Sequence, residues 1–184
     1  FVQQDNGEFV SVSANIKGAF TYVDTLNGEL IFLTQSQAPL GRLIAVKQGQ
    51  TLAEGRTLVA ECEMKLEDAI RQGDQLVLFY LKDAASFVRV VDAEGKKVHD
   101  LSLPSQWGAC TLAMQNGRGI RKSDSLILEF ESFVHSPMLL KLTGDQLSVL
   151  YQPNPKTAAD IEVRQIFTEA PDGERIPAFV VMPK

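Results

Sequence analysis

The sequence predicts an all-β chain that forms part of a β-propeller, about three four-stranded blades, followed by a β-hairpin. Three observations predict it. Apolar and polar residues alternate through most of the 184 residues, which is the periodicity of half-buried strands. A pattern of two apolar strands separated by a short segment of small or polar residues occurs three times. Near the end, Asp172-Gly173 lies between two extended segments, a strong hairpin signal because glycine accepts the positive φ of a tight turn.

Turn signals such as Asn27-Gly28, Glu94-Gly95 and Gly144-Asp145 separate the alternating segments. Strands are expected near residues 8–14, 19–26, 29–36, 42–48, 56–61, 66–71, 75–82, 86–92, 96–103, 107–114, 125–134, 138–143 and 146–151, with a hairpin over 160–169 and 175–182. Helix signals are poor. The composition of KLEDAIRQ (65–72) leaves a short helix as an alternative to a strand there.

The repeat is carried by the segments 28–46, 74–91 and 124–142. Each begins at a polar or glycine turn, continues into an apolar strand, breaks, and resumes as a second strand. A period of roughly 40–50 residues with four strands per period is typical of propeller blades, here 19–61, 66–103 and 107–152. A sandwich of about a dozen strands is the alternative. Three blades do not close a ring, so the blade count predicts a fragment.

Composition and charge exclude some classes of function. With 45% hydrophobic and 22% charged residues the chain is globular, and its formal net charge of −5 argues against nucleic-acid binding. No apolar run reaches the ~18–20 residues of a membrane span, so no membrane partner is expected. Cys62 and Cys110 have no metal-ligand spacing and are expected to be buried thiols, although the sequence leaves a disulfide open.

The stretch from 124 to 184 resembles the junction between propeller and hydrolase domains in serine peptidases of the prolyl oligopeptidase family. The matching pieces are FESFVHSPMLLKL (130–142), the linker YQPNPKTAADIEVRQIFTEA (151–170) and DGERIPAFVV (172–181). The segments 20–46 and 76–98 resemble earlier blades of the same propeller. The resemblance implies the C-terminal part, about three blades, of a seven-bladed propeller over residues 1–152. It also implies that 153–184 are a linker and the first hairpin of an otherwise absent α/β-hydrolase domain.

The resemblance further implies a non-catalytic role. The parent would cleave short peptides after proline, and its propeller would restrict access to the active site. The family's nucleophile elbow, G-x-S-x-G, occurs nowhere in the sequence, so no catalytic residue is carried over. No cofactor is expected. The implied partners are the missing hydrolase domain and, for the parent, short proline-containing peptides.

The remaining chemistry-bearing residues are expected to be structural. His99 is placed on an outer strand and His135 in a break next to Ser136, and neighbours on extended backbone point to opposite faces. Glu61-Cys62-Glu63 and Asp172/Glu174 lack a convergent third ligand, so no metal site is expected. Core packing is expected of the strand aromatics Phe20, Tyr22, Phe32, Phe79, Tyr80, Phe130 and Phe133. Trp107 is expected either to line a tunnel or to pack between blades.

Two hypotheses for function stay open at this point. The first is the propeller fragment of a peptidase, and the second is a stand-alone β-rich scaffold that binds a protein or peptide. Open blade faces and an unpartnered hairpin predict that the isolated chain associates with itself. The sequence leaves the compartment open between cytoplasm and periplasm.

Overall fold

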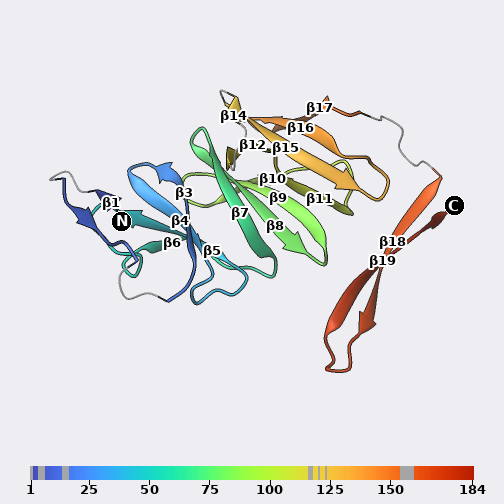
Figure 1. The fold of residues 1–184 in the computed structure, drawn as a ribbon, viewed down its shortest axis with the longest axis horizontal. Helices are drawn as coiled ribbons and strands as arrows, with labels where there is room; N and C mark the ends of the chain where they lie inside the picture. The colour runs from blue at the N-terminus through green and yellow to red at the C-terminus, as the bar shows by residue number, and fades with distance from the viewer. Residues whose placement is uncertain are drawn as a thin grey trace. The chain divides into compact units, whose positions relative to one another are not determined.

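The computed structural model describes residues 2–3, 7–13, 17–115, 118–119, 121–122, 124–153 and 160–184. Throughout these ranges every regular element is a β-strand (Figure 1). The described residues contain no helix with the length and apolarity that crossing a bilayer would require. The chain divides into two compact units, 1–80 with 89–100 and 81–88 with 101–184.

The first sheet has four antiparallel strands in the order β3-β4-β5-β6. Their bounds are β3 Phe20–Leu26, β4 Glu29–Thr34, β5 Arg42–Lys47 and β6 Arg56–Val59. Asn27 and Gly28 join β3 to β4 with φ values of 51° and 77°. Two positive φ values in a two-residue loop match the right-handed twist of a hairpin, which is why Asn-Gly stands at this turn. Before this sheet, β1 (Val2–Gln3) pairs with β2 (Phe9–Val10).

The second sheet follows the same scheme, in the order β7-β8-β9-β10. Its strands are β7 Lys65–Gln72, β8 Gln75–Lys82, β9 Ala85–Val91 and β10 Lys97–Asp100. The segment KLEDAIRQ is therefore strand β7, and the alternative of a short helix is wrong. Pairing with β8 and burial of Leu66 and Ile70 override the helical composition.

The third sheet contains the order β11-β15-β16-β17, and a short fifth strand, β14, also pairs with β15. The bounds are β11 Gly108–Leu112, β14 Arg121–Lys122, β15 Ser125–Ser132, β16 Met138–Thr143 and β17 Gln146–Tyr151. Two further short strands, β12 (Met114–Gln115) and β13 (Arg118–Gly119), pair with each other. The sequence pattern did not predict β12, β13 or β14.

Each unit has its own apolar interior. In the first unit, Leu43, Leu76 and Leu78 have no exposed surface and belong to one core cluster. In the second unit, alternate residues of β15 and β16 are buried: Leu126, Leu128, Phe130, Met138, Leu140 and Leu142. Strand β11 begins at Gly108. Any other residue there would clash with Phe130, because a Cβ atom would lie 2.6 Å from its ring.

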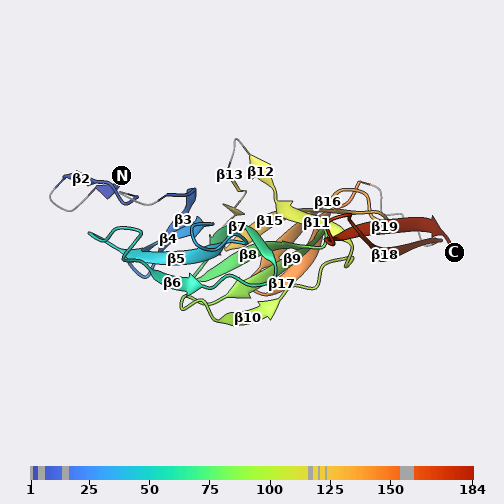
Figure 2. The same ribbon diagram turned by 90° about the horizontal axis from the view of Figure 1, so that it is seen from below.

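The last two strands form a separate two-stranded sheet (Figure 2). Strand β18 (Ile161–Glu169) pairs along its whole length with β19 (Arg175–Pro183). In the connecting turn the amide of Gly173 donates to the carbonyl of Ala170 at 2.9 Å, and Gly173 has φ 86°. The Asp-Gly signal thus marks the hairpin turn.

Candidate functional site

The two cysteines are both free thiols, so the disulfide alternative is wrong. Cys110 on β11 is buried, and burial raises the pKa of its thiol to about 12. Since the thiolate is the nucleophile, Cys110 is chemically inert in the folded chain. Cys62 is only half-buried, in contrast to the expectation, and its Sγ donates to the carbonyl of Met64 at 3.6 Å.

His135 makes its hydrogen bond with Ser132, not with the adjacent Ser136. The Ser132 hydroxyl lies 2.9 Å from Nδ1 of His135. The same hydroxyl oxygen accepts from the backbone amides of Val134 at 3.3 Å and His135 at 3.1 Å. These local bonds fix the break between β15 and β16. A hydroxyl engaged by two amides of its own turn is arranged to stabilise the turn, as side-chain caps of this kind do. His99 lies half-buried on β10, an outer strand of its sheet.

Carboxylates of the two acidic clusters, Glu61-Cys62-Glu63 and Asp172/Glu174, also accept hydrogen bonds from backbone amides. Glu61 accepts a hydrogen bond from the amide of Leu40, and Asp172 accepts one from the amide of Glu174 at 3.2 Å. The described part of the chain holds no group of three side chains that could ligate a metal ion.

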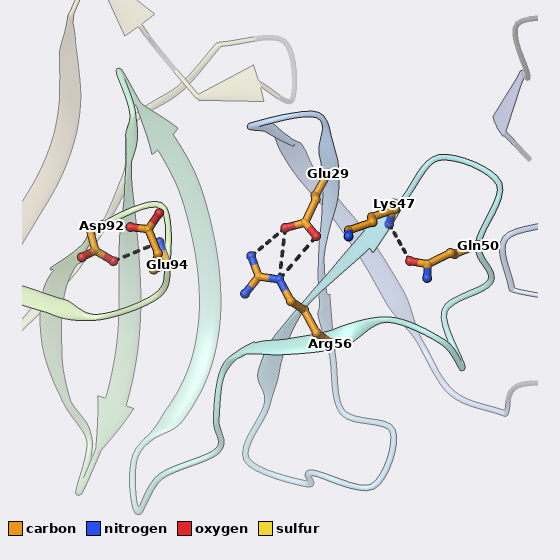
Figure 3. A network of polar contacts seen from close by, with 6 residues as sticks. All are labelled: Glu29, Lys47, Gln50, Arg56, Asp92 and Glu94. Carbon is orange, nitrogen blue, oxygen red and sulfur yellow. Dashed lines mark hydrogen bonds and ion pairs between the residues drawn. The ribbon is translucent and has the colours of Figure 1, made fainter.

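A polar network lies at the edge of the first sheet (Figure 3). Nη2 of Arg56 lies 2.6 Å from Oε2 of Glu29, and Nε of Arg56 donates to the same oxygen at 3.1 Å. This hydrogen bonding lowers the pKa of Glu29, with a smaller contribution from the charge of Lys47. The same hydrogen bonding raises the pKa of Arg56. The negative charge of Glu94 adds to this rise. The network joins strands β4 and β6 across β5, and its chemistry is that of a surface ion pair.

Two sheet faces carry open grooves. On the third sheet a groove of about 490 Å³ is lined by the carboxylates of Glu129 and Glu131 beside Leu139 and Tyr151. On the first sheet a groove of about 570 Å³ is lined mainly by the apolar residues Val12, Phe20, Tyr22, Leu30, Phe32 and Leu52. The described residues that line these two grooves include no nucleophile hydrogen-bonded to a base.

Trp107 lies directly before β11, and its ring contacts the hairpin. Its centroid lies 5.6 Å from that of Phe179, with the planes at 61°. Phe133 contacts Phe179 as well, at 5.0 Å. The sequence did not predict this contact of Trp107 with the hairpin. The sequence gives no local signal for this cluster, because its members lie far apart along the chain.

The strand aromatics differ in burial. Phe20 and Phe32 are partly buried and pack against a buried apolar cluster of the first unit. Phe79, Tyr80 and Phe130 are buried, as expected for core residues. The expectation of core packing is wrong for Tyr22 and Phe133, which are more than half exposed. Each contacts another ring, Phe32 and Phe179 respectively. Burial raises the pKa of Tyr80 to about 12, so its hydroxyl stays protonated.

The chain is similar to known peptidases. The family described as prolyl oligopeptidase, N-terminal β-propeller domain, matches residues 2–148. A prolyl endopeptidase of Dictyostelium discoideum is 26% identical over 92% of this chain and 24% of its own length. One of Elizabethkingia meningoseptica is 26% identical over 94% of this chain and 24% of its own. The chain therefore spans about a quarter of the length of these relatives.

Solved structures agree. A chain from a study of two prolyl endopeptidases and their inter-domain dynamics superposes with a TM-score of 0.77 at 27% identity, covering 92% of this chain and 25% of that one. Prolyl oligopeptidase B of Galerina marginata, bound to a 35mer substrate, superposes with a TM-score of 0.76. The superposition covers 97% of this chain and 25% of the oligopeptidase chain. At 16% identity it shows the fold alone.

These matches identify the four-stranded sheets as propeller blades and confirm the all-β, partial-propeller fold. They also confirm the resemblance inferred from the sequence, because the matched model covers most of the chain. The chain belongs to the prolyl oligopeptidase family, within its N-terminal β-propeller region.

Proposed function

We propose that this chain is the non-catalytic propeller part of a prolyl oligopeptidase-like serine peptidase. The observation that carries the proposal is the match of residues 2–148 to the family's propeller domain. The parent would cleave short peptides after proline, in keeping with relatives named prolyl endopeptidases. Residues 153–184 would then be a linker and the first hairpin of an α/β-hydrolase domain, which is the partner of this chain.

The chemistry of the residues supports a non-catalytic role. A serine peptidase needs a serine exposed on a sharp turn, a histidine that takes its proton and a carboxylate that orients the histidine. The sequence has no G-x-S-x-G elbow. The hydroxyl of Ser132 is engaged by the amides of its own turn. Hydrolysis by this chain alone is therefore not expected.

The propeller would act by restricting access. A narrow entry excludes folded proteins and long chains by size, and opening of an interface admits short peptides. This role requires a rigid wall around the active site, which hydrogen-bonded four-stranded sheets would provide. The parent would therefore discriminate between substrates by length as well as by sequence.

The test begins with the reading frame beyond the codon of Lys184. We would produce the 184-residue chain and, separately, the chain continued to the natural stop codon, and assay both with a chromogenic peptide ending in Gly-Pro. The expected result is hydrolysis by the continued chain only, with loss of activity after treatment with an organophosphonate. A stop codon directly after Lys184, or a continued chain without a G-x-S-x-G elbow, would overturn the proposal and favour a binding scaffold.

Selection of substrates by length is tested by comparing the cleavage of a short peptide with that of a long chain. An active parent is expected to cleave a proline-containing peptide of about ten residues and to leave an unfolded protein of more than about a hundred residues intact, because a restricted entry excludes long chains. Equal rates per proline site on both substrates would contradict gating while leaving the peptidase assignment in place.

A further inference from the structure

Among the described residues, side chains of the C-terminal hairpin contact the rest of its unit at one place in particular. We infer that these side chains form a releasable clasp, which holds the hairpin in one position and lets it detach without unfolding of the sheets. The clasp consists of the rings of Trp107, Phe133 and Phe179 and of the hydrogen bond from Gln165 to Asp83. The Nε2 atom of Gln165 donates to the backbone carbonyl of Asp83 at 2.7 Å.

The two hairpin residues of the clasp lie at a single point. Gln165 on β18 and Phe179 on β19 are directly paired across the hairpin. Directly opposite residues of an antiparallel pair point to the same face. The amide and the ring therefore contact the rest of the unit side by side, in the middle of strands that are nine residues long.

The partner side of the clasp comes from three separate loops. Asp83 lies in the turn between β8 and β9, with φ 50°. Trp107 directly precedes β11, and Phe133 directly follows β15. Each of these positions is fixed by a hydrogen-bonded strand next to it. The amide of Cys110 also donates to the hydroxyl of Ser86 at 3.0 Å, which ties β11 to β9 close to the clasp. The docking place is thus made of positions that the neighbouring strands hold.

The backbone hydrogen bonds within the hairpin do not involve the side chains of the clasp. Its strands are paired from Ile161 to Glu169, and the turn adds a bond from the amide of Ala170 to the carbonyl of Glu174 at 2.8 Å. Away from the clasp, Ile166, Phe167 and Ile176 remain exposed. The ring of Phe167 instead packs under the guanidinium of Arg175, 4.0 Å from its carbon.

The strength of the clasp fits a reversible contact. Two aromatic contacts and one neutral hydrogen bond shift an equilibrium by on the order of 10- to 1000-fold. Such a contact keeps the hairpin docked most of the time and still permits release. In the proposed function, on which only this last step rests, the hairpin begins the catalytic domain, and the clasp would set how that domain is held against the propeller.

The chain carries its own probe, because Trp107 is its only tryptophan. In Phe179→Ala the indole loses its partner in the hairpin. We expect its emission to move to longer wavelength and its quenching by acrylamide to rise by about twofold or more, as the docked population falls. Phe167→Ala is the matched control, since it removes the same ring from the same face of the hairpin without touching Trp107. Equal quenching in the wild type and in Phe179→Ala would overturn the clasp.

Release without unfolding needs a second measurement. On heating the wild-type chain, we expect the Trp107 emission to change at a lower temperature than the far-ultraviolet circular dichroism, because the hairpin leaves before the sheets melt. Gln165→Ala should lower the first transition and leave the second in place, whereas Thr168→Ala should alter neither. Coincident transitions in the wild type would show that the hairpin leaves only when the unit unfolds, and the releasable clasp would be wrong. Neither experiment requires peptidase activity, so the proposed function can fail while the clasp stands.

Discussion

Among single residues, Glu29 makes the stability of the first sheet depend on pH. Its carboxylate accepts hydrogen bonds from Arg56, which lowers its pKa below the usual 4.5. A lowered pKa in the folded state means that the contribution to stability is present above the unfolded pKa and is lost as the pH falls through the folded pKa. The side chain of Arg56 is 48% exposed, so the pair contributes little more than a surface ion pair does.

We therefore expect Glu29→Gln to lower the free energy of unfolding at pH 7 by less than about 1 kcal/mol. The difference from the wild type should shrink as the pH falls through the lowered pKa of Glu29, because the protonated carboxyl is then as uncharged as the glutamine side chain. Urea unfolding followed by circular dichroism at pH 7 and at a series of lower pH values measures this. Glu67→Gln serves as the control, because Glu67 pairs with Lys65 at 3.2 Å and both side chains are nearly half exposed. A Glu29→Gln effect that persists at low pH would contradict the ion-pair explanation.

Alanine substitutions at two glycines of similar backbone conformation distinguish the cost of a left-handed backbone from the cost of a steric clash. Gly28 and Gly95 have φ values of 77° and 79°. A Cβ on Gly28 meets nothing within 4 Å, whereas a Cβ on Gly95 would lie 2.0 Å from the carbonyl oxygen of Leu58. Gly28→Ala is expected to cost about 1 kcal/mol from the left-handed backbone alone. Gly95→Ala should cost about 2 kcal/mol more, because the β9–β10 turn must move away from β6. Equal losses in urea unfolding would show that the turn shifts freely.

For single residues, the sequence predicted structural roles better than it predicted which side chains contact each other. The structural roles expected for His135 and Cys110 agree with their local bonds and burial. The contact between Trp107 and Phe179 had no predictor, because aromatic pairing between distant segments leaves no periodicity in the sequence. Side chains that meet only through tertiary structure are the part of the candidate site that a single sequence does not reveal.

Among the elements, β15 is the central strand on which the third blade depends. Leu128 is wholly buried and pairs with Leu112 of β11 and Leu140 of β16. Leu128→Ala is expected to cost about 2–5 kcal/mol, since it leaves a cavity between three strands. Leu150→Ala on β17 makes the same chemical change at a position that is 52% exposed, and should cost less than about 0.5 kcal/mol. Urea unfolding followed by far-ultraviolet circular dichroism, which reports the sheets, measures both, and similar losses would contradict the assignment of β15 as core.

Strands were predictable where alternation and turn chemistry agree. The ranges 146–151 and 138–143 match β17 and β16 residue for residue, and Asp-Gly marked the last hairpin. Of the strand expected over 8–14, the described residues 8–13 contain only β2 at Phe9–Val10. The short strands β12, β13 and β14 were missed because two residues are too few to show a period. Pairing with a neighbour, rather than pattern, creates elements of this length.

For the whole molecule, exposed strand edges and open sheet faces dominate the behaviour expected of the isolated chain. Strand β17 forms one edge of its sheet and exposes Val149, Leu150 and Tyr151. The hairpin is a two-stranded sheet that exposes Ile166 and Ile176. Unpaired backbone groups beside apolar side chains are a template for pairing with another chain. A propeller domain with neighbours on these surfaces would not show this tendency.

We predict that the isolated chain associates with itself through these edges. In sedimentation velocity its weight-average mass should start near the monomer's 20.3 kDa and rise with concentration. Val149→Lys and Ile166→Lys each place a charge on an exposed edge strand, which opposes pairing in the way natural edge strands do. Both variants should shift association to concentrations about tenfold higher, since a buried charge costs at least the free energy of one order of magnitude. Leu40→Lys adds the same charge in an exposed loop and should leave association unchanged. A wild-type chain that sediments as a monomer at every concentration would show that twist and side chains already protect these edges.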